Sequence, residues 1–339
     1  MKPSTRNSFV LSAAILAASA LFASAYGDDC GPLQQAASVD ITMSPGGLPM
    51  VPVTLNGSPR QFLFGTAGGI STITQAAADS LNLHAVSSRV RLLSTNGNES
   101  GRFVSVESFV HGGLQGKDVS FMISPNPNLG SPNLPVDGEL AGDIMERYDT
   151  ELDFAGGKLG YFLPDHCDGH VVHWTTAPAS VVPFRRGRPG SRNIMDSHIR
   201  FHVTLDGKDL LAVLNTAAPR SQLSAKAADA MFNVTGDTPG TVPLGNMSGR
   251  KVFGYVFKTV SFGDVTVTNP HIVVIPDIIG LNDPENSNRT DSLVKRVDDD
   301  LGPDLTIGMD VLKNLHLYIA FGERKLYVTP ASAPVTAAK

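Results

Sequence analysis

Residues 61–71 read QFLFGTAGGIS, and residues 212–221 read AVLNTAAPRS, so the same pattern appears twice along the chain. The first stretch follows VPVTLNG at 51–57, and the second follows FHVTLDG at 201–207. Each copy predicts two strands joined by a tight turn, because Asn-Gly and Asp-Gly favour the left-handed conformations of two-residue hairpins. The match in context as well as in sequence indicates an internal duplication at an offset of 150 residues.

The duplication continues beyond these two stretches. Thr74 and Ser224 each precede a short alanine-rich segment and are expected to be helix N-caps, because their hydroxyl groups can accept from the free N–H groups of the first turn. Residues 143–145 (DIM) then match residues 310–312 (DVL), where the offset has become 167. The second copy is therefore 17 residues longer, and the polar stretch at 280–300 is the expected position of the insertion.

Length, composition and the duplication together predict an all-β protein of two similar lobes. A chain of 339 residues exceeds the about 150 residues typical of one domain. With 33 Gly and 23 Pro among short runs rich in Val, Thr, Phe and Leu, the chain favours strands and turns over long helices. We expect lobes at 38–165 and 180–330, joined by residues 166–179. The formal net charge of −5 gives no reason to expect nucleic acid as a partner.

The first 25 residues have the features of a signal peptide. Lys2 and Arg6 precede an apolar run at 9–21, and residues 23–25 (ASA) are small enough for signal peptidase. We therefore expect cleavage after Ala25 and a secreted or periplasmic protein. No later stretch approaches the about 20 apolar residues of a transmembrane helix, so no membrane span is expected.

The two cysteines, Cys30 and Cys167, are expected to form a disulfide, because an exported chain folds in an oxidising compartment. The alternative makes Cys167 a metal ligand together with His166, His170 and His173. On a strand, however, His170 and His173 would point to opposite faces. We expect the disulfide, and neither a metal nor a cofactor.

The duplicated pattern resembles the two-lobed, pepsin-like aspartic proteases, and also two retropepsin-like units fused in tandem. In that family each lobe carries an apolar pair followed by Asp-Thr/Ser-Gly, and later an apolar pair followed by Gly. Here the first elements are 63–67 (LFGTA) and 213–217 (VLNTA). The second elements are 140–143 (LAGD), with the glycine one place late, and 306–310 (TIGMD), where Gly308 fits. The resemblance covers about 48–328 and implies two pseudo-symmetric β-barrel lobes.

The chain departs from the family at both catalytic positions. The family mechanism needs an acidic side chain from each lobe, because two close carboxylates share one proton and activate a water molecule. Gly65 has no side chain, and Asn215 cannot act as an acid or a base. The loop segments 66–78 and 216–228 contain no Asp or Glu within reach of these positions that could substitute. We therefore expect no intact catalytic pair.

The rest of the loop pattern is retained. The resemblance implies that Thr66 and Thr216 hydrogen-bond between the lobes and hold the two loops together. Ala67 and Ala217 stand where the family has glycine, which narrows the backbone conformations available there. The alternative is that both threonines are ordinary strand or turn residues, since threonine is common in strands.

A hairpin is expected in the first lobe. Asn96-Gly97 separates two runs of alternating apolar and polar residues, which is a strong hairpin signal. In the family such a hairpin is a flap that closes over an extended peptide, so the chain could bind a peptide by strand addition. The alternative is a plain surface hairpin.

Three functions are compatible with these observations. The first is a secreted aspartic-protease-like protein that is catalytically inactive and binds an extended peptide between its lobes. The second is an active aspartic-type peptidase that uses carboxylates from outside the two degenerate loops, such as Asp143 or Asp310. The third is an envelope protein that binds a partner with its outer surface and whose cleft is vestigial.

Overall fold

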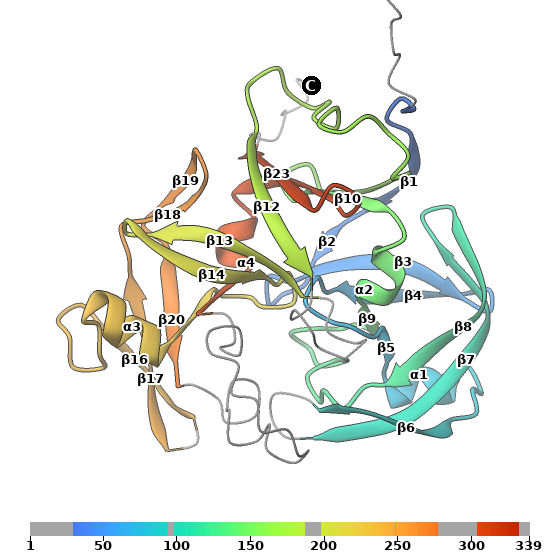
Figure 1. The fold of residues 1–339 in the computed structure, drawn as a ribbon. Helices are drawn as coiled ribbons and strands as arrows, with labels where there is room; N and C mark the ends of the chain where they lie inside the picture. Colours follow the sequence, from blue (N-terminus) through green and yellow to red (C-terminus); the bar gives the residue numbers. More distant parts are fainter. Residues whose placement is uncertain (1–29, 94–97, 187–197, 248, 277–303, 332–339) are drawn as a thin grey trace, which may run out of the picture.

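The computed structural model describes residues 30–93, 98–186, 198–247, 249–276 and 304–331 (Figure 1). The expected signal peptide, the hairpin tip at Asn96-Gly97 and the expected insertion at 280–300 lie outside these residues. The described part is mostly strand, with four short helices: α1 (Gln75–Ser80), α2 (Gly142–Met145), α3 (Ala225–Phe232) and α4 (Met309–Leu312). None of the helices in this part is long and apolar enough to cross a membrane.

The first half of the chain forms an eight-stranded sheet in the order β2-β3-β4-β9-β5-β8-β7-β6. An additional pairing between β3 and β7 closes six of these strands into a barrel. The strands are β2 (Thr42–Met43), β3 (Pro49–Leu55), β4 (Ser58–Phe64), β5 (Thr72–Ile73), β6 (Val86–Leu93), β7 (Glu99–His111), β8 (Leu114–Ile123) and β9 (Gly138–Leu140). Alternate residues of β3 point into the barrel, as expected for a strand with one buried face.

The second half repeats this arrangement within a larger sheet that runs β13-β14-β21-β15-β20-β17-β16. The strand β18 pairs with β13, as β7 does with β3. The strands are β13 (Ile199–Leu205), β14 (Lys208–Leu214), β15 (Gln222–Ser224), β16 (Val242–Met247), β17 (Arg250–Val256), β18 (Thr259–Phe262), β19 (Val265–Thr268), β20 (His271–Ile275) and β21 (Leu305–Ile307). The protein is thus all-β, with two pseudo-symmetric lobes.

The same large sheet also joins strands from both halves, in the order β1-β11-β10-β22-β23-β12. Figure 1 shows blue β1, green β10 and red β23 together in this region. The strands are β1 (Gln35–Asp40), β10 (Asp149–Asp153), β11 (Lys158–Phe162), β12 (Ser180–Arg186), β22 (Leu315–Ala320) and β23 (Lys325–Pro330). At its centre, β10 pairs with β22 antiparallel, with Thr150 opposite Ile319 and Leu152 opposite Leu317. An offset of 167 maps one pair onto the other, so a pseudo-twofold axis passes between these strands.

The duplication read from the sequence is confirmed in the backbone. Strands β3 and β4 have the same bounds as β13 and β14 after a shift of 150 residues. Asn56 and Asp206, the first turn residues, have φ values of 48° and 44°, which is the left-handed conformation that this type of turn requires. The N-caps are also confirmed, since Thr74 accepts from the Ala77 N–H and Ser224 accepts from the Ala227 N–H.

The predicted disulfide is confirmed. Cys30 and Cys167 are bonded, which fixes the segment before β1 to the segment after β11. Cys167 is therefore not available as the metal ligand that the alternative required. Instead, His166 is buried and paired with Asp149, with 2.6 Å between Nε2 and Oδ2, and His173 contacts Glu151.

We expect loss of the disulfide to destabilise the protein. A bridge between residues 137 apart lowers the entropy of the unfolded chain. In the chain-entropy account of disulfides, this stabilises the folded protein by about 3 to 5 kcal/mol. The Cys30→Ser/Cys167→Ser variant should therefore unfold at a lower denaturant concentration, measured by fluorescence in urea. Thiol titration of the oxidised, denatured wild type should find no free thiol among these two cysteines. Two free thiols in that titration would contradict the pairing.

Candidate functional site

Two loops, one after β4 and one after β14, meet where the halves of the molecule face each other. The Thr66 N–H donates to Thr216 Oγ1 at 3.1 Å, and the Thr216 N–H donates to Thr66 Oγ1 at 3.1 Å. The Thr66 hydroxyl donates to the Leu214 carbonyl at 3.0 Å, and the Thr216 hydroxyl donates to the Phe64 carbonyl at 2.5 Å. Both threonines are buried. The four hydrogen bonds obey the pseudo-twofold symmetry and fix the two loops against each other.

Each loop is also fixed within its own half by a serine and an aspartate. Ser71 donates its N–H and its hydroxyl to Asp143, and Ser221 does the same with Asp310. Each serine hydroxyl in turn accepts the N–H at the start of the short helix, from Ala141 in one half and Gly308 in the other. Asp143 and Asp310, which the sequence offered as substitute catalytic carboxylates, are therefore engaged in holding the loops.

The displaced glycine of the first half has a packing explanation. In the second half, a Cβ on Gly308 would lie 2.5 Å from the Arg220 carbonyl carbon and 2.8 Å from the Ala218 carbonyl oxygen, so only glycine fits there. In the first half, Ala141 occupies the equivalent position, and the residue opposite it is Gly68, where a Cβ would lie 2.9 Å from the Ala141 Cβ. The glycine is thus on the loop in the first half, at residue 68, and at the start of the short helix in the second half, at residue 308, where the loop backbone approaches it.

Gly65 leaves space that a residue from another strand fills. A Cβ built on Gly65 would overlap Glu139 Oε1 and would lie 2.9 Å from the Glu139 Cδ. Glu139 is the central residue of β9, which pairs parallel with β4 so that Glu139 is opposite Leu63. The Gly65 N–H donates to the carbonyl of the next residue, Leu140, at 2.9 Å. The carboxyl group of Glu139 thus lies where a side chain at position 65 would begin.

Glu139 was not among the substitute acids that the sequence suggested, which were Asp143 and Asp310. A signal was present, however. The offset of 167 aligns Gly138-Glu139-Leu140 with Leu305-Thr306-Ile307. These two segments are the short strands β9 and β21, which pair with β4 and β14, the strands that lead into the two loops. A charged residue at the centre of such a strand is unusual, because its neighbours Gly138 and Leu140 are buried.

The second loop presents an amide at the matching position. The Oδ1 atom of Asn215 accepts from the Ala217 N–H at 2.9 Å. This leaves Nδ2 as the free end of the side chain, since it makes no hydrogen bond to another described residue. Asn215 is partly exposed. The site therefore combines one carboxyl group, from Glu139, with one amide donor, from Asn215.

The electrostatic environment favours the neutral form of Glu139. Burial, and secondarily the nearby Asp143 carboxylate, raise the pKa of Glu139 to about 7. The pKa of Asp143 is also raised by burial, although its hydrogen bonds from Ser71 oppose that shift. A carboxyl group with a pKa near neutrality can donate a hydrogen bond in weakly acidic solution and can only accept one in alkaline solution.

Other residues expected at the site lie around the two loops. Ala67 and Ala217 are partly buried and directly follow the threonines. The expected hairpin is formed by β6 and β7, with Leu93 opposite Glu99 at the last pair before the tip. Its tip, Asn96-Gly97, falls outside the described residues, so its position relative to the loops stays a prediction.

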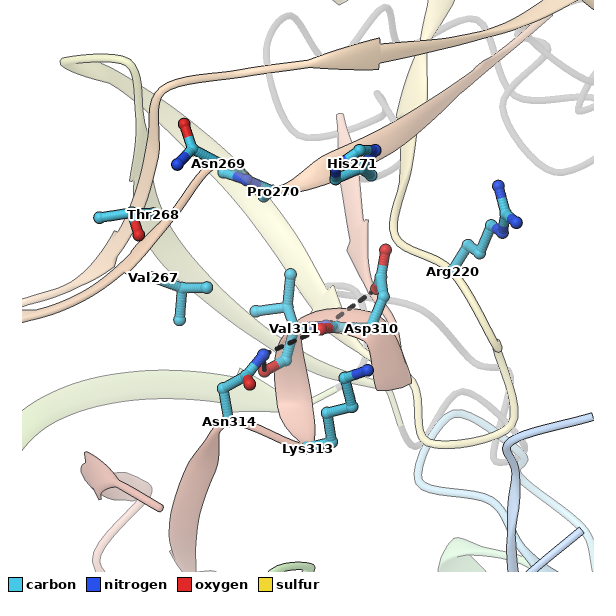
Figure 2. Close-up of a pocket in the computed structure, with 10 residues that line it drawn as sticks. All are labelled: Arg220, Val267, Thr268, Asn269, Pro270, His271, Asp310, Val311, Lys313 and Asn314. Atoms are coloured by element: carbon cyan, nitrogen blue, oxygen red, sulfur yellow. Dashed lines mark hydrogen bonds between the residues drawn. The ribbon is translucent and has the colours of Figure 1, made fainter. Parts of the chain in front are cut away.

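A separate pocket of about 340 Å³ lies on the second half of the molecule. Figure 2 shows the 267–271 turn on one side of it and Asp310, Lys313 and Asn314 of the α4 region on the other. Arg220 also lines it, but neither Gly65 nor Asn215 does. The pocket is thus behind the second loop rather than between the two loops.

Two pseudo-symmetric β lobes whose paired Thr loops hydrogen-bond to each other are the arrangement that the resemblance to aspartic proteases implies. In agreement with that resemblance, residues 51–141 match the family model described as aspartyl protease. The solved structure of basic 7S globulin from soybean aligns with a TM-score of 0.49 at 11% identity, covering 91% of this chain and 97% of that one. A search of curated proteins finds no match to the sequence.

We expect the threonine pair to contribute strongly to stability. Thr66→Val and Thr216→Val each remove a hydroxyl that donates one bond and accepts another, and they leave buried N–H and carbonyl groups unpaired. Each should cost roughly 1–3 kcal/mol. The double variant should cost less than the sum, because the two substitutions remove different bonds of one contact between the same two loops and the first already loosens that contact. Urea unfolding measures this, with Thr54→Val on β3 as the control. Additive losses, or losses equal to the control, would contradict the arrangement.

Gly308→Ala and Gly65→Ala should differ in their effect on stability. At Gly308 the new Cβ meets backbone atoms of Arg220 and Ala218, which cannot move alone, so overpacking should cost about 1–3 kcal/mol. At Gly65 it meets the end of the Glu139 side chain, which can rotate away. Both substitutions reduce the entropy of the unfolded chain alike, so the difference in urea midpoints reports the native contacts. Equal urea midpoints for the two variants would contradict the contacts described for a Cβ at Gly308 or for one at Gly65.

Proposed function

We propose that the protein is an exported aspartic-protease-like protein that binds an extended peptide where its two loops meet and does not cleave it by the two-carboxylate mechanism. The observation that carries this proposal is the contrast within the loops. The threonine hydrogen bonds that position the catalytic pair in this class are complete, while Gly65 and Asn215 provide no carboxylate of their own. The framework for holding a ligand is retained without the chemistry of the acid pair.

Strand addition is the proposed binding mode. An extended peptide gains affinity from main-chain hydrogen bonds, and side-chain pockets add specificity. The hairpin formed by β6 and β7 belongs to the same half of the molecule as the Gly65 loop. We propose that it covers the bound peptide as a flap, with lobes at 38–165 and 180–330 on either side and residues 166–179 connecting them.

Export is part of the same proposal. The Cys30–Cys167 disulfide is typical of proteins that fold in an oxidising compartment. A signal peptide ending at Ala25 would leave Cys30 close to the mature N-terminus, where the disulfide attaches it to the segment after β11.

The other two functions have less support. An active peptidase that relies on Asp143 or Asp310 would need carboxylates that are instead engaged by Ser71 and Ser221. An envelope protein with a vestigial cleft gives no reason for a carboxyl group of raised pKa at the Gly65 position. Peptide binding at the loops accounts for both the retained threonines and this carboxyl group.

The purified mature protein should cleave no peptide between about pH 3 and 7 and should not bind a statine-type inhibitor, because the acid pair that holds the inhibitor hydroxyl is missing. Cleavage is measured with a quenched fluorescent peptide library. Peptide binding is measured separately with the same library lacking the quencher. Acid cleavage by the wild type would contradict the proposal.

Restored variants provide the matched comparison. Gly65→Asp/Asn215→Asp should remain inactive, because an Asp carboxylate at residue 65, unlike the single Cβ of Ala, competes with the Glu139 carboxyl for the same space and repels it. Adding Glu139→Thr reproduces the residue of the second copy, Thr306, and frees that space. Acid cleavage that appears only in the triple variant would support both descent from an active aspartic protease and the placement of Glu139 at the Gly65 position.

A further inference from the structure

We propose that Glu139 has taken over the position of the missing first-loop carboxylate and that its protonated carboxyl donates a hydrogen bond to a main-chain carbonyl of the bound peptide. This inference rests on the proposed function, because it names the groups of the same site that contact the ligand. It replaces the symmetric acid pair of the class with a carboxyl group from β9 and an amide from the second loop.

The position of the carboxyl group is the first step of the argument. Overlap between a Cβ on Gly65 and Glu139 Oε1 places the carboxyl at the start of the path that an Asp side chain at residue 65 would follow. A Cβ on Gly68 would also lie 3.2 Å from the same oxygen, so the carboxyl rests over the loop backbone. Both positions are glycine, and the loop therefore leaves room for the Glu139 side chain.

The carboxyl group is also available to a ligand. Among the described residues, no group hydrogen-bonds to it, and residue Glu139 is partly exposed, unlike its buried neighbours Gly138 and Leu140. A carboxyl group that lacked a partner in a structural role would be costly, because desolvation without a hydrogen bond is unfavourable. A ligand carbonyl would supply that partner.

The neighbouring groups decide which protonation state binds. Asp143 of α2 is the charged group that acts on Glu139 among the described residues, and its carboxylate disfavours a second negative charge. From β4 and β5, the residues opposite Glu139 are Leu63 and Thr72, and neither titrates in this range. The loop contributes Gly65 and Gly68. A bound peptide would exclude more water and so favour the neutral, donating form further.

Asn215 complements this donor. Its Nδ2 group is the free end of the side chain on the opposite loop, and the threonine bonds fix that loop against the first. Two donors, one from β9 that lies against the first loop and one on the second loop, suit the carbonyl oxygens of an extended main chain, which is the part of a peptide that every sequence shares. The two donors would therefore contact the main chain of the peptide, and other parts of the protein would contact its side chains.

Binding should consequently weaken as the pH rises through about 7. If only the protonated form binds, the affinity should fall up to about tenfold for each pH unit above the pKa of the free protein. Glu139→Gln keeps a donor of similar shape that does not titrate, so its affinity should be independent of pH. Gly65→Ala should displace the carboxyl and weaken binding in acid while the fold is retained.

The experiment selects a random octapeptide library on the wild-type protein at about pH 5.5 and measures the affinity of the selected peptide from about pH 5.5 to 8.5, the interval that brackets this pKa. Wild type, Glu139→Gln, Gly65→Ala and the control Asp229→Asn, at an exposed residue of α3, are compared by fluorescence anisotropy, with folding checked by circular dichroism. A pH-dependent wild type with a flat Glu139→Gln profile supports the inference, provided Asp229→Asn behaves as wild type.

The other outcomes separate the two proposals. A selected peptide that binds with the same pH profile to wild type and Glu139→Gln overturns the role of Glu139 but leaves peptide binding intact. A folded protein that selects no peptide at any pH overturns the proposed function and this inference together. Neutral-pH cleavage of the selected peptide that disappears in Glu139→Gln also overturns the binding role, because Glu139 would then be a catalytic residue.

Discussion

The reciprocal hydrogen bonds between Thr66 and Thr216 are the constraint on which the site depends. Each hydroxyl accepts one N–H and donates to one carbonyl of the opposite loop, so neither loop can rotate without breaking buried bonds. Because the bonds come in symmetric pairs, they also fix residues 65 and 215 in equivalent positions. The identity of those two residues can therefore change without loss of the framework, since neither Gly65 nor Asn215 contributes a side chain to these bonds.

Fixed loops have a second consequence, which is that lost volume must be supplied by neighbouring elements. At the crossing of loop and short helix, Ala141 in the first half faces Gly68, whereas Gly308 in the second half lies directly against backbone atoms of Arg220 and Ala218. The same compensation operates at Gly65, where Glu139 from β9 fills the space left by the absent side chain. The two halves thus share a backbone but fill it with different side chains.

Much of the fold could be predicted from the sequence, because the repeated turns, caps and apolar strands are local signals. The left-handed Asn56 and Asp206 and the caps at Thr74 and Ser224 follow from the chemistry of those residues. The pairing of β10 with β22 could not be read in this way, since it joins segments about 170 residues apart whose sequences carry no register signal. Glu139 was hidden for the same reason, because parallel pairing brings it to a loop more than 70 residues earlier in the chain.

The physical cost of Glu139 is the strongest reason to assign it a role. Thr306 at the equivalent position shows that the short strand accepts an uncharged residue, and an apolar or hydroxyl side chain would serve the packing of the Gly65 loop without a desolvated acid. A carboxyl group whose pKa is raised to about 7 by burial destabilises the folded protein as the pH rises above the ordinary value for glutamate, because the folded state resists its ionisation. If the loops had only to hold the halves together, nothing in this geometry would require that group. A bound main-chain carbonyl would remove the cost by giving the neutral carboxyl its missing partner.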